Sequence, residues 1–228
     1  MGKNIGVIIP AAGAGRRLGG VSKPLIEVDG KPVINRLLAL FSCLENVTRI
    51  CLAVPGNSLP EFRSIVTSGK YRPPIEIVEG GSERPLSVQN AFAAIRQRLA
   101  DDDLVCIHDA ARPLLSREDL ERVVDAAWKH DAAFLASRVK DTLKLVDEKG
   151  FCLSTIDRSR VFAAQTPQVI AAGLLKDVYS RVKDVSGKTD EIMLLEEIGI
   201  KAFVVEPRHP NFKITTYEDL YLLKKMVS

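Results

Sequence analysis

Short, continuously apolar runs alternate along the chain with longer segments whose apolar residues recur at helical spacing. The apolar runs predict strands at residues 5–10, 48–54, 75–79, 104–108, 133–137 and 201–205. Helical spacing predicts helices at residues 32–44, 60–68, 85–99, 117–130, 171–183, 189–198 and 217–227. Because continuously apolar strands are covered on both faces, this order predicts a Rossmann-like α/β fold, a three-layer sandwich with a mostly parallel sheet between helices.

The alternation breaks over residues 138–162, which are polar, β-capable and centred on the turn Asp147-Glu148-Lys149-Gly150. This pattern predicts a β-hairpin arm projecting from a single domain that spans residues 1–228. A long arm exposes its strand edges unless something covers them. It is therefore either a surface hairpin without a role or the contact with a second subunit.

Composition limits the function without naming it. The 228 residues are 46% hydrophobic and 27% charged, which indicates one folded domain and excludes a disordered scaffold. A net charge of +3 is too small to indicate nucleic-acid binding, so an anion site must be local. No apolar run approaches the ~20 residues that cross a bilayer, and we expect a cytoplasmic protein. Three of the four cysteines lie in apolar runs and are expected to be buried, reduced thiols.

Candidate chemistry follows the strands, because ligands of open α/β sheets bind beyond the strands' carboxyl ends. The first strand is followed by a loop rich in glycine and alanine, residues 10–24, with cations at Arg16, Arg17 and Lys23. Small residues leave backbone N–H groups free to hold phosphate oxygens, and the cations match a triphosphate. The dinucleotide-binding pattern fails at Leu18 and the Walker pattern fails at Val21, so the sequence predicts a different phosphate-binding loop.

The loop after the third strand carries Gly80 and Gly81, which would let the backbone approach a flat ligand such as a base edge. Ser87 follows in the first turn of the next helix. It either caps that helix or faces the ligand.

The loop after the fourth strand contains residues 108–113, HDAARP. Asp109 can hold Mg²⁺ against phosphate oxygens or cap the next turn. Arg112 can pair with Asp109 or bind a second anion, and His108 is expected in the core rather than as a base. Lys213, between apolar residues near the end of the chain, is either a surface lysine or a further cation of the site.

These segments resemble the 2-C-methyl-D-erythritol 4-phosphate cytidylyltransferase family of the non-mevalonate isoprenoid pathway. The matching pieces occur in the family's order and read PAAGAGRRL, SKP, GGSERPLSV, HDAARP, RVKDTLK, IDRSR, QTPQ, TDE and NFKIT. Two places depart from the family pattern. Ser82 stands where the family often has Asp, and Ser22 and Pro24 flank Lys23 where it usually has Pro and Gln.

The resemblance implies a homodimer, with the arm of one subunit closing the partner's site, and it implies CTP, a polyol phosphate and Mg²⁺ as ligands. It implies catalytic roles for Arg17, Lys23, Arg158 and Lys213. The nucleotide-binding residues would be Ala11, Ala12, Gly13, Gly15, Gly81, Ser82 and Ser87. The acceptor would be bound by Arg112, Asp141, Thr142 and Thr189, and the metal by Asp109.

The reaction implied is transfer of the cytidylyl group from CTP to 2-C-methyl-D-erythritol 4-phosphate, with release of pyrophosphate. The nucleophile is an ionised phosphate, which agrees with a sequence that shows no Ser-His or Cys-His pair. Other interpretations are a ribitol-5-phosphate cytidylyltransferase and a sugar-phosphate nucleotidyltransferase using UTP or GTP. Two further interpretations lie outside this class: a regulatory protein on a transferase fold and a nicotinamide oxidoreductase. Leu18, in place of the third glycine of the dinucleotide-binding pattern, argues against the oxidoreductase.

Overall fold

A seven-stranded sheet forms the centre of the protein in the computed structural model, which describes residues 4–13 and 22–227. The strand order is β11-β7-β10-β6-β1-β4-β5. The bounds are β1 Ile5–Pro10, β4 Val47–Val54, β5 Ile75–Glu79, β6 Leu104–Ile107, β7 Ala132–Arg138, β10 Phe162–Ala171 and β11 Phe203–Val205. All neighbours pair in parallel except β10, which runs antiparallel to β6 and β7. The predicted α/β sandwich is confirmed.

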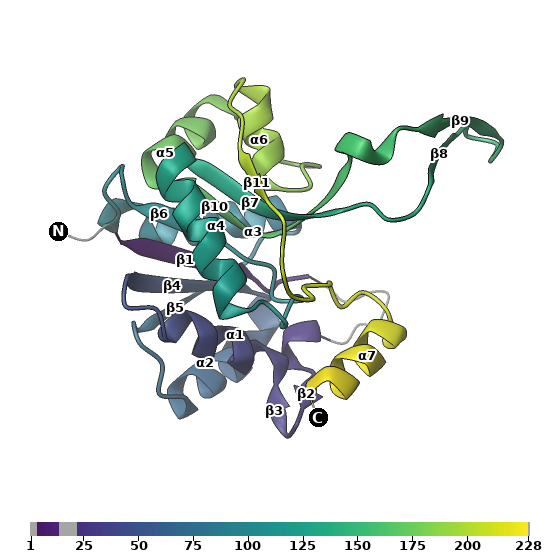
Figure 1. Cartoon of the computed structure of the whole chain (residues 1–228). Coiled ribbons are helices and arrows are strands. Elements are labelled where there is room, and N and C mark those ends of the chain that lie inside the picture. Colours follow the sequence, from purple (N-terminus) through teal and green to yellow (C-terminus); the bar gives the residue numbers. More distant parts are fainter. Residues whose placement is uncertain (1–3, 14–21, 228) are drawn as a thin grey trace.

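Helices cover both faces of the sheet (Figure 1). One face packs on α1 (Val33–Ser42), α2 (Leu59–Ser68) and α4 (Arg117–His130). The other face packs on α3 (Arg84–Ile95), α5 (Ala172–Arg181) and α6 (Glu191–Glu197). Because helices bury both faces, β1 and β6 are apolar at nearly every position, which explains the runs seen in the sequence.

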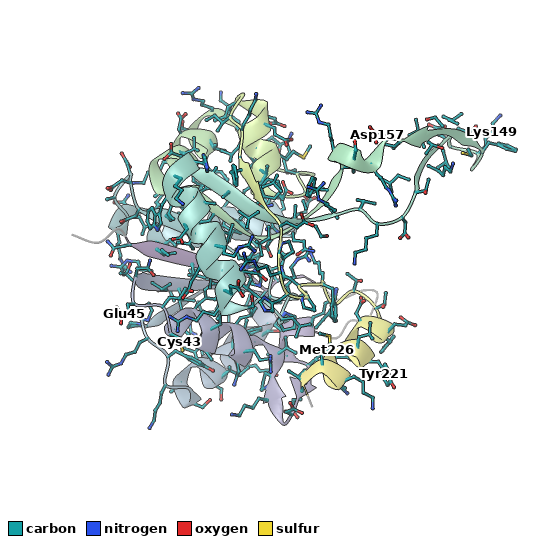
Figure 2. All side chains as sticks on the ribbon, in the orientation of Figure 1. Cys43, Glu45, Lys149, Asp157, Tyr221 and Met226 are labelled. Atoms are coloured by element: carbon teal, nitrogen blue, oxygen red, sulfur yellow. The ribbon has the colours of Figure 1, made fainter. Side chains whose placement is uncertain are left out.

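A small third core lies at one end of the sandwich. The closing helix α7 (Tyr217–Val227) packs through Leu223 against Val28 of the short hairpin β2–β3 (Glu27–Val28, Lys31–Pro32). Tyr221 and Met226 of α7, both labelled in Figure 2, are exposed. Single helical turns lie at η2 Lys23–Leu25, η3 Gly56–Ser58, η4 Arg96–Arg98 and η5 Arg158–Arg160. Within residues 4–13 and 22–227, no helix is long and apolar enough to cross a membrane.

Strand β10 is the strand of the central sheet that the sequence pattern did not predict. It lies at residues 162–171, between the expected arm and the expected helix at 171–183. Pro167, which follows a cis peptide bond, interrupts its apolar run, and the pairing with β7 shifts register between Ala164 and Gln168. A proline cannot donate to a β-ladder, so its presence argued against a central strand.

The expected arm is present. β8 (Leu143–Val146) pairs with β9 (Cys152–Ile156) in an antiparallel hairpin that forms a sheet of its own. Figure 1 shows it extending away from the sandwich, and Figure 2 places Lys149 near its tip. The arm exposes large apolar side chains: Leu145, Val146, Phe151, Leu153 and Ile156.

The cysteines follow the sequence expectation only in part. Cys51 and Cys106 are buried and free, and burial raises the pKa of the Cys51 thiol to about 12. Cys43 and Cys152 are also free but exposed. The prediction of three buried thiols was therefore wrong by one, because an apolar run on an amphipathic helix or an arm strand still has an outer side.

Candidate active site

A cavity of about 470 Å³ opens at the carboxyl ends of the central strands. It lies where β1 and β6 run side by side, so the loops that follow these two strands meet there. Its wall comprises Pro10–Gly13, Lys23, Pro24, Gly81–Arg84, Ser87, Asp109–Ala111, Lys213 and Thr215. Residues far apart in sequence thus form one concave surface, at the edge of the sheet that the sequence predicted.

Asp109 is the electrostatic centre of this wall. Arg84 donates from Nε to Oδ1 of Asp109 at 2.8 Å, and Lys213 donates from Nζ to Oδ2 at 2.8 Å. Burial alone would raise the pKa of Asp109, but the charges of Arg84 and Lys213 outweigh it and hold that pKa far below its ordinary value. Asp109 is therefore a fixed anion that draws two cations to the cavity.

Arg84 is held from behind by a second carboxylate. Its Nη1 donates to both oxygens of Glu191, at 3.1 and 2.9 Å, and the Glu191 side chain has no exposed surface. Burial raises the pKa of Glu191, while the charge of Arg84 opposes the rise. Neither residue was predicted as part of the site. A cation three positions after Gly81 was a usable signal for Arg84, but nothing in the sequence linked it to Glu191, 107 positions away.

His108 supports the loop that carries Asp109 and is fully buried. The backbone N–H of Asp109 donates to the Thr166 hydroxyl at 3.0 Å, which lies 3.1 Å from His108 Nδ1. Nε2 lies 2.9 Å from the Arg112 carbonyl, so Nε2 carries the proton and Nδ1 accepts from Thr166. Burial lowers the pKa of His108 to about 4. The expectation of a core histidine is confirmed, and both ring nitrogens are already engaged.

The glycine pair after β5 allows close packing against neighbouring residues. A Cβ on Gly80 would lie 2.4 Å from the Cβ of Ala12, and one on Gly81 would lie 2.3 Å from the Cβ of Leu86. Only residues without a side chain fit this close approach. Because the loop after β5 packs this closely on the loop after β1, the two loops form one wall of the cavity.

Ser87 fastens the same loop to α3. Its hydroxyl accepts from the Gly81 N–H at 3.1 Å and donates to the Glu83 carbonyl at 3.0 Å. Glu83 is the N-cap of α3, so the alternative that Ser87 caps this helix is wrong. Ser87 lines the cavity through a side chain that is already hydrogen-bonded to protein.

Hydrogen bonds of the residues next to Lys213 hold it at the cavity. Arg112 donates from Nη1 to the Asn211 carbonyl at 2.8 Å, and Asn211 donates to the Thr166 carbonyl at 2.8 Å. The Ile214 N–H donates to the Ala111 carbonyl at 2.8 Å. Lys213 is thus a cation of the site and not an isolated surface lysine, whereas Arg112 stands behind the wall, its Nε 3.8 Å from Asp109 Oδ2.

The remaining predicted residues fall into three groups. Those along the cavity wall are Ala11, Ala12, Gly13, Lys23, Gly81 and Ser82. Gly15 and Arg17, like Arg16, lie outside the described residues. In the part of the chain that the structure describes, Asp141, Thr142, Arg158 and Thr189 are exposed and are not among the lining residues. The first three belong to the arm and its base, so one subunit does not bring them to its own cavity.

The site suits a divalent cation only in combination with a ligand. Among residues 4–13 and 22–227, no three His, Cys, Asp or Glu side chains converge as a metal cluster. Asp109 offers one carboxylate, with a cation at 2.8 Å from each oxygen. Mg²⁺ is commonly bound by one or two carboxylates, phosphate oxygens and water. Asp109 is therefore the residue that would hold Mg²⁺ if the ion arrived with a phosphate ligand.

Comparison with known proteins gives a consistent result. The model of the 2-C-methyl-D-erythritol 4-phosphate cytidylyltransferase family matches residues 5–228. The protein of that name from Endomicrobium trichonymphae is 39% identical over 221 residues, 96% of this chain and 97% of the relative. The one from Bacillus licheniformis is 37% identical over 227 residues, 98% of this chain and 96% of the relative.

Solved structures agree with these relatives. The 4-diphosphocytidyl-2C-methyl-D-erythritol synthase of Anaerococcus prevotii superposes with a TM-score of 0.82 at 29% identity, covering 99% of this chain and 96% of that one. The 2-C-methyl-D-erythritol 4-phosphate cytidylyltransferase of Francisella tularensis gives 0.80 at 31% identity, covering 98% and 99%. The similarity extends over the whole sandwich and is not limited to the cavity.

Proposed function

The chain belongs to the 2-C-methyl-D-erythritol 4-phosphate cytidylyltransferase family, and on this premise we propose that it transfers the cytidylyl group of CTP to 2-C-methyl-D-erythritol 4-phosphate. An oxygen of the acceptor phosphate attacks the α-phosphorus of CTP, the bond to the β-phosphate bridging oxygen breaks, and pyrophosphate leaves. The observation that carries the proposal is that Lys23, Arg84 and Lys213 line one cavity, where Arg84 and Lys213 both donate to the Asp109 carboxylate.

This cavity is suited to joining two anions. The nucleophile is already ionised, so no general base is required, and the nearby His108 has no ring nitrogen to spare. What the reaction needs is opposite charge and fixed orientation, because two phosphates repel each other. We assign to Lys23 and Lys213 the stabilisation of charge at the reacting phosphate, together with Arg17 of the glycine-rich loop.

The nucleotide is assigned to the two loops pressed together at the cavity wall. Ala11, Ala12 and Gly13 would offer backbone groups to the triphosphate, while Gly81 and Ser82 would face the base and ribose. Gly15 of the same glycine-rich loop is included in this assignment. A Cβ on Gly13 would meet no described residue within 4 Å, so among residues 4–13 and 22–227 that position leaves space for a ligand to approach the backbone.

Mg²⁺ is the proposed metal, held by Asp109 and by oxygens of the nucleotide. When bound, it neutralises phosphate charge and orients the triphosphate. Lys213 would then turn from Asp109 toward the acceptor phosphate, since its side chain is more exposed than that of Arg84. Arg84 stays in place because Glu191 also holds it.

The acceptor pocket is proposed to form between two subunits. Arg158, Asp141 and Thr142 lie on or near the arm and do not line their own subunit's cavity. The arm's exposed apolar side chains would be covered by a second copy of the chain. We therefore assign these three residues to the partner's cavity, where they would complete the acceptor pocket with Arg112 and Thr189 of that subunit.

Pyrophosphate release tests the reaction. We expect release with CTP and 2-C-methyl-D-erythritol 4-phosphate, and much slower release with UTP or GTP or with ribitol 5-phosphate as the acceptor. Preference for ribitol 5-phosphate would replace the proposed acceptor while keeping the transfer. Absence of any CTP-dependent release would contradict the proposal.

The cysteines bear on where the enzyme works. The buried free thiols Cys51 and Cys106 suit the reducing cytoplasm in which we place the enzyme.

Mixing two inactive variants tests the shared site. If the arm crosses over, each site takes Lys213 from one subunit and Arg158 from the other. Lys213→Ala then impairs the site of its own subunit, and Arg158→Ala impairs the site of its partner. A mixed dimer then has one site with both changes and one intact site. Equal mixing should restore about a quarter of wild-type activity, because about half of the dimers are mixed and each has one intact site. No recovery after exchange of subunits would place Arg158 in its own subunit's site.

A further inference from the structure

Glu191 is a carboxylate with no exposed surface, and it lies behind the cavity wall in the first turn of α6. Both of its oxygens accept from Nη1 of Arg84, and its backbone N–H donates to Oε1 of Gln168 at 3.0 Å. Burying an ion pair is commonly less favourable for stability than burying apolar side chains of similar volume. The position of this carboxylate therefore calls for a role beyond packing.

One nitrogen of the Arg84 guanidinium, Nη2, makes no hydrogen bond to the described residues. Nε and Nη2 form one edge of the guanidinium, and such an edge often grips both oxygens of a carboxylate. Here Nε donates to Oδ1 of Asp109 at 2.8 Å, while Oδ2 accepts from Lys213 instead. Nη2 is therefore buried without a hydrogen-bond partner among the described residues, on a side chain that lines the cavity.

We propose that Glu191 is a positioning residue of the active site: by holding Nη1 of Arg84, it keeps Nε on Asp109 and leaves Nη2 to donate to a phosphate oxygen of the bound nucleotide. The inference rests on the proposed cytidylyl transfer. It adds Arg84 as a residue that touches the substrate, and Glu191 as a residue that acts through Arg84.

The charge of Glu191 matters because Asp109 is surrounded by cations. Arg84 and Lys213 both contact it, and Arg112 lies 3.8 Å from its Oδ2. Without an anion behind it, Arg84 would close on both oxygens of Asp109 and compete with Lys213 for Oδ2. Glu191 holds the guanidinium back, so Oδ2 remains the acceptor of Lys213.

The experiment is a double-mutant cycle between Glu191→Gln and Arg84→Met, with Glu196→Gln as the matched control on the exposed side of the same helix. Two quantities are measured: the affinity for CTP by calorimetry without acceptor, and kcat/KM for CTP at saturating acceptor. Glu191→Gln should lower both by about 10- to 100-fold, the usual cost of losing a partner that orients a ligand-binding group. The KM of the acceptor should change much less.

Non-additivity distinguishes positioning from a merely structural role. If Glu191 acts through Arg84, the double variant should be no worse than Arg84→Met alone. Additive losses, or a lowered thermal midpoint with unchanged CTP affinity and kcat/KM, would overturn the inference, because Glu191 would then only anchor α6.

Arg84→Lys covers the case in which Glu191→Gln does not fold. Lysine keeps the charge but has one nitrogen in place of three, so we expect a loss of about tenfold or more in CTP affinity. Wild-type affinity in Arg84→Lys would overturn the inference. A wild-type enzyme that releases no pyrophosphate would instead overturn the proposed function, and the CTP affinities would still decide the role of Glu191.

Discussion

The cavity wall and the arm are built in opposite ways. At the wall, Asp109 contacts Arg84 and Lys213, and Arg84 in turn contacts the buried Glu191. On the arm, β8 and β9 pair with each other, while side chains such as Phe151 stay exposed. Buried polar groups need several partners at once, so the wall has one low-energy arrangement. The arm can take its final position only from whatever covers it.

The largest loss of catalytic rate is expected from Lys213→Ala, at the cavity wall. Removing one preorganised cation from a phosphoryl-transfer site typically lowers the rate by about 10²–10³. Lys201→Ala, an exposed lysine outside the cavity wall, is the control and should retain wild-type turnover. Steady-state pyrophosphate release measures both. Near wild-type turnover of Lys213→Ala would remove this residue from the mechanism.

The next largest effect is expected where the two loops of the wall touch. A methyl group on Gly80 would lie 2.4 Å from the Cβ of Ala12, so Gly80→Ala must push the loops apart. We expect it to lower the unfolding free energy by about 1–3 kcal/mol and to weaken CTP binding. Gly13→Ala, whose Cβ meets no atom within 4 Å in the part of the chain that the structure describes, is the comparison for stability and should unfold like the wild type. Equal stability of the two variants would show that the loops are not tightly packed.

A smaller effect is expected at Asp119, which fixes the chain leading to Lys213. Its carboxylate accepts from the N–H groups of Arg208 at 2.8 Å and His209 at 3.0 Å, and from the Ser116 hydroxyl at 3.0 Å. Asp119→Asn keeps the shape but loses the charge that strengthens these bonds, and we expect a cost of about 1–2 kcal/mol. Urea unfolding at pH 7 measures it.

The cost of Asp119→Asn should also depend on pH. Burial raises the pKa of Asp119, but hydrogen bonds from the Arg208 and His209 N–H groups outweigh it and hold the pKa below 3.8. Because the native pKa lies below the unfolded one, the stabilisation is complete above the unfolded pKa and is lost as pH falls through the native pKa. The stability difference between wild type and variant should therefore be constant from pH 7 to 5 and shrink below pH 4. A difference that grows toward low pH would contradict this.

The smallest effect on subunit stability is expected on the arm. Phe151 is 69% exposed within one subunit, so Phe151→Asp should leave the folding of that subunit unchanged. If a second copy covers the arm, the same change should halve the mass measured by light scattering and reduce activity. Lys144→Ala, which loses only an exposed contact to Thr155, should change neither. An unchanged mass for Phe151→Asp would show that this side chain is not in a dimer contact.

The apolar pattern located most of the fold. Strands such as Ile5–Pro10 and helices such as Arg117–His130 appear where periodicity placed them, because burial of one face or of both faces leaves a direct mark on the sequence. β10 escaped because Pro167 interrupts it. Periodicity reports burial within one segment and contains no information about which segments become neighbours.

The candidate site, like the fold, could be predicted from the sequence only in part. Lys23, Gly81 and Asp109 were predicted as candidates because they lie in loops that follow strands, and such loops meet at the carboxyl edge of a parallel sheet. Arg84 lies only three positions after Gly81 in the sequence and was still missed as a ligand-binding candidate. Its importance appears only in its contacts with Asp109 and Glu191.

The sequence by itself determined the layered sandwich and the presence of an arm, and it predicted phosphate-binding loops, since each of these inferences depends on properties local to a segment. The tertiary structure alone decided that Glu191 holds Arg84, that Thr166 and His108 support Asp109, and that Lys213 completes the wall. Such contacts join positions tens to a hundred residues apart, and their strength depends on burial and on distances of about 3 Å, which exist only once the sheet has assembled.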